Sequence, residues 1–388
     1  MAVPARVDIP RFASMEKAIG ALRPTEPVYC LHPEKFKVAA GRFLEGFPGD
    51  AMYAVKANPA PQVLDLVWAA GIRHFDTASL GEVELIKTRF AEAQCHFMTA
   101  VRIGGHAKAA FERFDVADYV VDCDHELDKL IHETGEPAKL RVFVRMVTQL
   151  GGALLELSSK FGTDPDEAAR LLKRIAALGA QPCITFHVGS QCLSPFSYAQ
   201  AIEIARRAID KSGIRIAALD IGGGFPGPYQ NNDVPPYLWY FDTIREALAT
   251  LERPDLPILC EPGRALIAEG VSLITQVILR KGDRLYINDG TYGSFDELTL
   301  PGWNADYPTR VFTVDAKGRA LPLPGSLKPF RVYGPTCDTL DVLPRPQMLP
   351  EGIGPGDFIV FDAMGAYSVA VRTTFNGFYP DHWVQIGN

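Results

Sequence analysis

Short strand patterns alternate with amphipathic helix patterns from about residue 28 to residue 261, and this alternation constrains the fold more than any other feature. Strands that are joined through helices pair in parallel. The predicted strands are Met52–Lys56, His74–Ala78, Cys95–Met98, Asp118–Asp122, Arg141–Met146, Ile184–Val188, Ala218–Gly222 and Ile258–Glu261. The predicted helices are Gln62–Ala70, Gly81–Phe90, Asp164–Leu178, Tyr198–Ser212 and Tyr237–Leu251. This number of strands favours a closed (β/α)8 barrel, with a doubly wound open sheet as the alternative.

After about residue 270 the pattern changes to short strands that are separated by glycine and proline. The predicted strands here are Val271–Leu279, Arg284–Asn288, Arg310–Val314, Phe330–Tyr333, Asp357–Phe361 and Tyr367–Arg372. Such a series predicts an all-β domain of antiparallel strands. We therefore expect a barrel over residues 28–269 and a C-terminal β-domain over residues 270–388, to which residues 1–27 also belong.

Composition excludes several classes of protein. A net charge of −7 gives no basic surface for nucleic acid. No apolar run reaches the roughly 18 residues of a membrane span, and the amino-terminal residues lack the apolar segment of a signal peptide. The seven cysteines are scattered without a Cys-x-x-Cys pair. This usage is typical of a reducing cytoplasm and speaks against a disulfide framework or a metal site.

The lysine that ends the first predicted strand is the first candidate for chemistry. Lys56 closes the apolar segment Met52–Val55 and is followed by Asn58 and Pro59. Burial disfavours the charged ammonium, so a buried lysine has a lowered pKa and acts as an amine nucleophile toward an aldehyde. The alternative is a side chain that leaves the strand end for water, and this segment alone favours that alternative.

Further reactive groups stand at the carboxyl ends of other predicted strands, which is where (β/α)8 enzymes carry their active sites. They are Asp76, Arg145, His187, Ser190, Gly222, Gly223, Gly224, Glu261 and Arg264. Burying so many polar groups at one edge would be costly without a function.

The glycine run in DIGGGFPG is the clearest of these features. Glycines allow backbone N–H groups to approach an anion, and Arg264 can add a bidentate cation to the same phosphate. The alternative is a tight turn between a strand and a helix. The run lacks the GxGxxG spacing, which disfavours a nicotinamide dinucleotide.

Glu261 bears on the type of reaction. A carboxylate beside the ring nitrogen of an aromatic cofactor keeps that nitrogen protonated, and the resulting pyridinium is a strong electron sink. His187 is a candidate to stack on such a ring. The alternatives are a surface glutamate at a helix amino end and a histidine that is satisfied within the core.

Two segments of the β-domain carry candidates as well. The loop GPTCDTLD places Cys337 and Asp338 among turn residues, where a thiol can exchange a proton and a carboxylate can bind an amine. In the segment MGAYS, the phenol of Tyr367 can bind a phosphate. The alternatives are a loop with one incidental cysteine and an ordinary strand tyrosine.

Together these segments resemble a known family. YAVKANP, FDTAS, FHVGSQC, DIGGGFPG, CEPGR, NDGTYGSF, GPTCDTLD, MGAYS and TFNGF occur in the order found in the ornithine/lysine/diaminopimelate decarboxylases, over residues 28–379. The resemblance implies pyridoxal 5′-phosphate as the cofactor and a barrel of the alanine-racemase type with a C-terminal β-domain. GPTCDTLD looks most like the ornithine decarboxylase branch.

The resemblance also implies roles for the barrel residues. Lys56 would form the Schiff base with the cofactor, His187 would stack on its ring, and Glu261 would pair with its ring nitrogen. Asp76 and Arg145 would shape the cofactor site. The phosphate would be held by Ser190, Gly222, Gly223, Gly224, Arg264 and Tyr367.

In the β-domain, the resemblance implies that Cys337 returns a proton to the substrate carbon and that Asp338 and Tyr292 bind the substrate. Cys337 and Asp338 would act in the barrel of the neighbouring subunit, so the active unit would be a homodimer with shared sites. The implied reaction is the decarboxylation of a basic L-amino acid in the cytoplasm, with L-ornithine to putrescine first and L-lysine to cadaverine second.

The sequence departs from the family near Leu300 and Pro301, where the ornithine decarboxylases of animals carry a second aspartate for the distal amine. One alternative is a decarboxylase of 2,4-diaminobutyrate, diaminopimelate or arginine, although Asp338 speaks against diaminopimelate. Another is a non-catalytic regulatory homologue, like the antizyme inhibitors. The intact Lys56 and Cys337 argue against that role.

Overall fold

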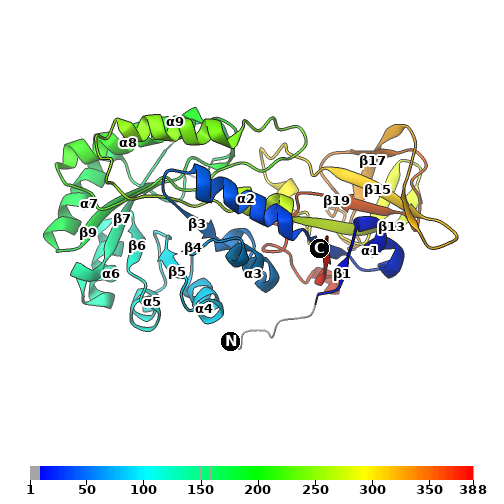
Figure 1. Cartoon of the computed structure of the whole chain (residues 1–388), viewed down its shortest axis with the longest axis horizontal. Coiled ribbons are helices and arrows are strands. Elements are labelled where there is room, and N and C mark those ends of the chain that lie inside the picture. Colours follow the sequence, from blue (N-terminus) through cyan, green and yellow to red (C-terminus); the bar gives the residue numbers. More distant parts are fainter. Residues whose placement is uncertain (1–8, 149, 157–158, 388) are drawn as a thin grey trace.

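Two bodies make up the molecule, and the computed structural model describes residues 9–148, 150–156 and 159–387 of it. Figure 1 shows a barrel ringed by helices and, beside it, a sheet that contains β13, β15, β17 and β19. The largest cluster of buried apolar side chains has members in both bodies, so they share one core. Within the described ranges, no helix is both long enough and apolar enough to cross a membrane.

The barrel consists of eight parallel strands in the closed order β11-β12-β3-β4-β5-β6-β7-β9. Their bounds are β3 Asp50–Ala54, β4 His74–Thr77, β5 Gln94–Phe97, β6 Asp118–Val121, β7 Arg141–Met146, β9 Gln181–Phe186, β11 Leu219–Asp220 and β12 Ile258–Cys260. The predicted (β/α)8 barrel is confirmed. The open-sheet alternative is wrong, because β12 pairs with β3 and closes the ring.

Helices connect the barrel strands and cover their outer face (Figure 1). They are α2 Pro33–Gly46, α3 Pro61–Ala69, α4 Leu80–Arg89, α5 His106–Phe114, α6 Asp124–Thr134, α7 Pro165–Ala177, α8 Phe196–Ser212, α9 Tyr237–Ala249 and α10 Arg264–Ile267. Side chains fix two of the starts, since Ser79 and Asp164 accept hydrogen bonds from backbone N–H groups in the first turns of α4 and α7. The five predicted helices match α3, α4, α7, α8 and α9 to within two residues, whereas α2, α5, α6 and α10 were not predicted.

The second body is a ten-stranded sheet that is built from both ends of the chain. Its strands are β1 Arg11–Phe12, β2 Val28–Leu31, β13 Val271–Lys281, β14 Arg284–Ile287, β15 Thr309–Val314, β16 Ala320–Pro322, β17 Leu327–Tyr333, β18 Gln347–Pro350, β19 Phe358–Phe361 and β20 His382–Ile386. β2 pairs antiparallel with β13 and parallel with β20, and α1 (Met15–Leu22) contacts β16 and β20. The domain boundaries at residues 28 and 270 stay a prediction. Residues Val28–Leu31, which were assigned to the barrel domain, are hydrogen-bonded within the sheet.

Two predicted strands differ from the structure at positions that matter for the candidate site. β3 ends at Ala54, and Lys56 lies in the 3₁₀ turn Val55–Ala57, because the Asn58 N–H turns back to the Val55 carbonyl. The predicted strand Tyr367–Arg372 is wrong, since its residues form bends and turns. Tyr367 has a φ of 53°, a left-handed conformation that a strand cannot contain.

The bend over residues 363–368 brings the sheet onto the turn that holds Lys56. The Tyr367 N–H donates to the Ala57 carbonyl at 2.9 Å, and Asn58 Nδ2 donates to the Gly365 carbonyl at 2.8 Å. A Cβ on Gly365 would lie 1.8 Å from a carbonyl oxygen of the barrel side, so this approach requires glycine. The sheet therefore contacts the carboxyl end of the barrel directly.

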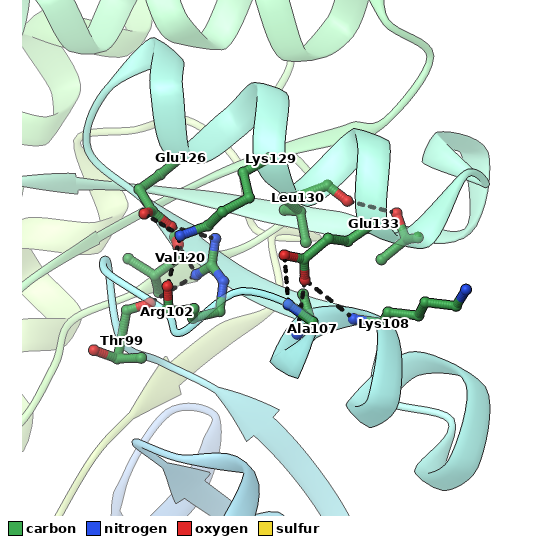
Figure 2. Close-up of polar contacts among 11 residues, drawn as sticks. Thr99, Arg102, Ala107, Lys108, Val120, Glu126, Lys129, Leu130 and Glu133 are labelled. Atoms are coloured by element: carbon green, nitrogen blue, oxygen red, sulfur yellow. Dashed lines mark hydrogen bonds and ion pairs between the residues drawn. The ribbon is translucent and has the colours of Figure 1, made fainter.

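A polar cluster fixes α6 at the ends of β5 and β6 (Figure 2). Buried Arg102 donates to the carbonyl oxygens of Thr99 at 2.8 Å and Val120 at 2.5 Å, and its guanidinium lies 3.4 Å from Glu126. Lys129 Nζ donates to the Arg102 carbonyl at 2.6 Å and to Glu126 at 2.5 Å. The cluster holds α6 against the segment after β5, which is a structural role.

A second polar chain lies near the amino ends of β4 to β7. His74 Nδ1 lies 3.0 Å from His96 Nε2, and His96 Nδ1 lies 2.5 Å from Asp118 Oδ2. Arg141 Nε donates to Asp118 Oδ1 at 2.7 Å. Burial raises the pKa of Asp118, but the hydrogen bonds from His96 and Arg141 and their charges more than offset this and bring it to about 2. These hydrogen-bonded side chains therefore favour an ionised Asp118. They lie at the end of the barrel opposite the one that holds Lys56.

Candidate active site

The ends of the first two barrel strands bring an amine and a carboxylate together. Lys56 Nζ lies 2.6 Å from Asp76 Oδ2; the lysine side chain is 42% exposed and the aspartate 1%. Burial lowers the pKa of Lys56, but the charges of Asp76 and Glu261 outweigh it, so the net shift is upward. The predicted lowering of the Lys56 pKa is therefore wrong. The sequence did not reveal that two carboxylates would lie beside the amine.

Three carboxyl groups are buried at this end of the barrel: Asp76, Asp220 and Glu261. Asp220 accepts hydrogen bonds from Thr185 Oγ1 at 2.6 Å and from the Gly222 N–H at 2.9 Å, and burial raises its pKa to about 6. Burial also raises the pKa of Glu261 well above its ordinary range, and the charges of Asp76 and Asp220 raise it further. Glu261 therefore favours its protonated form until a cation, such as a protonated ring nitrogen, pairs with it.

His187 follows β9 and is held neutral. Its Nδ1 accepts a hydrogen bond from the Gly189 N–H at 3.0 Å, so the proton of the neutral ring lies on Nε2. Burial, together with the positive charges of Arg145 and Lys56, lowers the pKa of His187 to about 3. Arg145 itself packs its guanidinium 5.7 Å from the centre of the Phe161 ring. A neutral imidazole in this position can stack on an aromatic ring.

The three glycines after β11 form a turn that no larger residue fits. Gly222 and Gly224 have φ angles of 68° and 99°. A Cβ on Gly222 would lie 2.0 Å from the Phe186 carbonyl oxygen, and one on Gly223 would lie 2.8 Å from that of Glu261. The backbone therefore lies tightly against the ends of β9 and β12. Such a turn at a barrel end offers N–H groups to an anion.

Arg264 begins α10 and is buried. Its two terminal nitrogens donate to both carboxylate oxygens of Glu297, Nη1 also donates to Tyr229 at 2.7 Å, and Nη2 lies 3.3 Å from Ser190 Oγ. Among the described residues its Nε has no hydrogen-bond partner. The edge of the guanidinium formed by Nε and Nη2, beside Ser190, is therefore the one that remains for an anion.

Glu297 is a residue of this site that sequence reasoning missed. The bidentate contact expected between Arg264 and a phosphate is made with Glu297 instead, so only the Nε and Nη2 edge is open to an anion. Glu297 lies 33 residues from Arg264 in the 3₁₀ turn Asp296–Thr299, where a glutamate has the pattern of an ordinary turn residue. The ring of Tyr367 completes the surroundings, with its centre 4.8 Å from the guanidinium carbon.

The remaining predicted residues lie together on two loops of the sheet. The Tyr292 hydroxyl donates to Asp338 Oδ2 at 2.5 Å, and the Cys337 N–H donates to Asn376 Oδ1 at 3.0 Å. The Cys337 side chain is exposed. Across the described ranges, no hydrogen bond or ion pair joins these loops to Lys56. The structure thus forms two separate groups, one at the barrel end and one on the sheet.

Leu300 and Pro301, the positions at which the second aspartate of the animal ornithine decarboxylases was expected, carry no acid. Leu300 follows the turn that holds Glu297, and its side chain is 37% exposed. A Cβ on nearby Gly302 would lie 3.5 Å from the Leu154 carbonyl oxygen. Leu154 belongs to β8 (Ala153–Leu155), which pairs with β10 (Ser190–Cys192). Residues 300–302 therefore approach the barrel beside Ser190 without supplying a carboxylate.

The barrel group fits a planar aromatic aldehyde that carries a phosphate. Lys56 offers the amine, Glu261 a carboxyl group for a ring nitrogen, and the glycine turn N–H groups for the phosphate. Among the buried polar atoms that lack a hydrogen-bond partner within the described residues are two of this group, Asp76 Oδ1 and Arg264 Nε. In the same residues, no group of three His, Cys, Asp or Glu side chains is arranged to hold a metal ion.

Comparisons with known proteins agree with this geometry. A family model described as the pyridoxal binding domain of pyridoxal-dependent decarboxylases matches residues 34–268. The lysine/ornithine decarboxylase of Selenomonas ruminantium is 35% identical over 336 residues, covering 84% of this chain and 81% of that protein. The ornithine decarboxylase of Schizosaccharomyces pombe is 34% identical over 348 residues, covering 84% and 75%. The crystal structure of the Paramecium bursaria Chlorella virus arginine decarboxylase has a TM-score of 0.82 and 27% identity, covering 95% of this chain and 98% of that chain.

Proposed function

The chain belongs to the pyridoxal-dependent decarboxylase family, and from that membership we propose that it converts L-ornithine to putrescine, a step of polyamine biosynthesis, and also accepts L-lysine. It is a pyridoxal-phosphate-dependent amino-acid decarboxylase, and the decarboxylases described above are named for basic amino acids. The observation that carries the choice of substrate is the loop with Cys337 and Asp338, where a thiol stands next to one carboxylate that is held by Tyr292.

Pyridoxal phosphate supplies an aldehyde for the substrate amine and a ring that accepts the electron pair left on the α-carbon when carbon dioxide departs. Lys56 would hold the aldehyde, and Glu261 would hold the ring nitrogen in its cationic form. Neutral His187 would pack on the ring, with Asp76 and Arg145 beside it. The phosphate would lie against Ser190, Gly222, Gly223, Gly224, Tyr367 and the Nε and Nη2 edge of Arg264.

The two loops of the sheet would act on the other side of the substrate. Cys337 would return a proton to the α-carbon after carbon dioxide has left. Asp338 would bind the distal ammonium group. The Leu340 N–H and the Tyr292 hydroxyl both donate hydrogen bonds to Asp338 and lower its pKa, so it is ionised and suited to a cation. The Tyr292 hydroxyl would orient this carboxylate.

We propose a homodimer in which each loop pair serves the barrel of the partner subunit. Two features support this arrangement. Cys337 is exposed, and the neighbouring Leu340 is 73% exposed on the same loop. Phe375, whose ring lies against that of Tyr292, is also 40% exposed, and exposed apolar side chains that gather on one face mark a surface for another chain. The cytoplasm stays the predicted location, from the cysteine usage alone.

A panel of substrates tests the proposed activity. Purified protein with pyridoxal phosphate is assayed for carbon dioxide release from ornithine, lysine, 2,4-diaminobutyrate, arginine and diaminopimelate. We expect the highest kcat/KM for ornithine, and a clear preference for arginine or another acid would overturn the substrate assignment. Asp338→Asn is expected to raise KM for ornithine at least about tenfold, whereas Asp315→Asn, which changes a partly exposed turn aspartate of the same body, leaves it unchanged.

Subunit complementation tests the shared sites. Lys56→Ala is expected to be inactive as a homodimer, and Cys337→Ala is expected to form little of the diamine that the wild type forms, so diamine formation is the activity measured. After mixing and reassembly, half of the dimers are hybrids with one intact site, so about a quarter of the wild-type activity returns. A mixture that stays inactive, although hybrids are shown to form, would exclude a site shared between subunits.

A non-catalytic regulatory homologue is the competing candidate. The intact Lys56, Glu261 and Cys337 speak against it, because a purely regulatory role does not need them. The absorbance of the purified protein decides the matter. A decarboxylase binds pyridoxal phosphate and shows its visible band, and Lys56→Ala removes that band; a regulatory homologue shows no activity on any amino acid of the panel.

A further inference from the structure

We propose that Asp341 is the positioning residue that fixes the two substrate loops of the sheet against each other. The first loop carries Tyr292, and the second carries Cys337 and Asp338. This inference rests on the proposed function, since those three residues would serve the substrate. Asp341 itself would touch neither substrate nor cofactor.

The carboxylate of Asp341 gives one oxygen to each loop. Oδ1 accepts hydrogen bonds from the Thr291 N–H at 2.8 Å and the Thr291 hydroxyl at 3.2 Å. Oδ2 accepts from the Thr336 N–H at 3.0 Å and the Thr336 hydroxyl at 2.7 Å. The side chain is 1% exposed, so water does not compete for these bonds. Asp341 therefore joins two segments that lie far apart in the sequence.

Glycines bring both loops against this carboxylate. A Cβ on Gly290 would lie 2.1 Å from Asp341 Oδ1, and one on Gly334 would lie 2.2 Å from the same atom. The second loop also closes on itself, because the Gly334 N–H donates to the Asp341 carbonyl at 2.9 Å and the Asp341 N–H donates to the Asp338 carbonyl at 3.1 Å. The backbone on both sides is thus shaped around a buried acid.

Each anchored threonine directly precedes a proposed functional residue. Thr291 is followed by Tyr292, and Thr336 is followed by Cys337. The hydrogen bond of 2.5 Å between Tyr292 and Asp338 spans the two loops just outside the anchor. A shift of one loop would therefore move the phenol away from the carboxylate and the thiol away from the substrate carbon.

The chemistry at this position requires an acid. Four donors converge on Asp341, and a carboxylate accepts from all of them. In Asp341→Asn, one oxygen becomes an NH₂ group, which faces a backbone N–H that can only donate. One of the two loops must then move, although the size of the side chain is unchanged. The variant tests positioning without opening a cavity.

Steady-state kinetics of the holoenzyme give the first test. Misplacement on the order of 1 Å predicts a roughly 10- to 100-fold loss of kcat/KM in Asp341→Asn, with the visible band of bound pyridoxal phosphate unchanged. In an Asp338→Ala background, the same change should raise KM little further, because both act on one contact. Additive effects on KM would show that Asp341 does not act through Asp338.

The control for general damage is Asp362→Asn, which changes a half-buried acid bonded to Ser272 and Arg310 in another part of the same body. It is expected to lower the melting temperature without the KM effect. If Asp341→Asn does not fold, Thr336→Val removes a single hydroxyl donor from the same anchor. A smaller loss of kcat/KM supports the proposal in that case, and unchanged kinetics overturn it.

Complementation separates this inference from the proposed dimer. A hybrid of Asp341→Asn with Lys56→Ala contains one site with the intact barrel of the first chain and the intact loops of the second. About a quarter of the wild-type activity should return if Asp341 acts through its loops. Failure of this pair, when Lys56→Ala with Cys337→Ala succeeds, overturns the role of Asp341. Failure of both pairs overturns the shared site itself.

Discussion

Glu297→Gln is the most direct test of how the barrel and the sheet are held together. Arg264 and Glu297 are each 3% exposed and share two hydrogen bonds. The change leaves the guanidinium buried without its counter-charge, while the glutamine keeps the shape of the side chain. Removing one partner of a buried ion pair costs about 3–5 kcal/mol. Because Arg264 keeps its contact with Tyr229 at 2.7 Å, we expect the lower end, about 3 kcal/mol.

Urea denaturation followed by circular dichroism measures this loss. The chain has two bodies, so the shift of the transition midpoint is compared between variants instead of a single unfolding free energy. Measurements with and without saturating pyridoxal phosphate show whether the cofactor offsets part of the loss. Glu34→Gln is the matched control, because its partner Lys37 and Glu34 itself are 61% and 70% exposed. That surface pair is worth at most about 1 kcal/mol.

A double variant separates the lone charge from damaged packing. Arg264→Met with Glu297→Leu removes both charges and is expected to recover most of the lost stability, since apolar pairs replace buried ion pairs at little cost. The same protein should bind inorganic phosphate and pyridoxal phosphate more weakly than wild type. The reasoning is refuted if Glu297→Gln shifts the midpoint no more than Glu34→Gln does, or if the double variant is as unstable as the single one.

Three further changes address other parts of the molecule. Asp118→Asn should remove on the order of 2 kcal/mol of stability at neutral pH, because the ionised carboxylate, with its pKa lowered to about 2, stabilises the fold above the unfolded pKa. This contribution is lost as pH falls toward 2, so the difference in urea midpoint between the variant and wild type should shrink by about half between pH 7 and pH 3. Gly224→Ala should abolish the visible cofactor band. The added Cβ would lie 2.4 Å from a carbonyl oxygen, and the residue has a φ of 99°, so a normal band would contradict the tight turn. Cys337→Ala should leave that band intact but slow diamine formation or divert it to another product, as followed by chromatography of the products; unchanged diamine formation would exclude the thiol as the proton donor.

Much of the barrel followed from the sequence because its determinants are local. A strand that alternates with a helix has a period that can be read from about ten neighbouring residues, and parallel pairing follows from the connections. The glycine turn was also visible, since Gly222 and Gly224 adopt positive φ angles that few other residues adopt. The family membership rested on the same short segments and is confirmed by the match over residues 34–268.

The tertiary structure decided the features that depend on partners far away in the chain. Glu297 accepts hydrogen bonds from Arg264. The charges of Asp76 and Glu261 raise the pKa of Lys56, whereas the sequence had predicted a lowered pKa. Tyr367 lies in a bend where a strand was predicted, because the segment docks on the turn that holds Lys56. Asp341 accepts a hydrogen bond from Thr291, which lies 50 residues earlier in the sequence. Local periodicity determines which elements form, but burial and charge pairing arise only when distant segments meet, and these set the chemistry of the site.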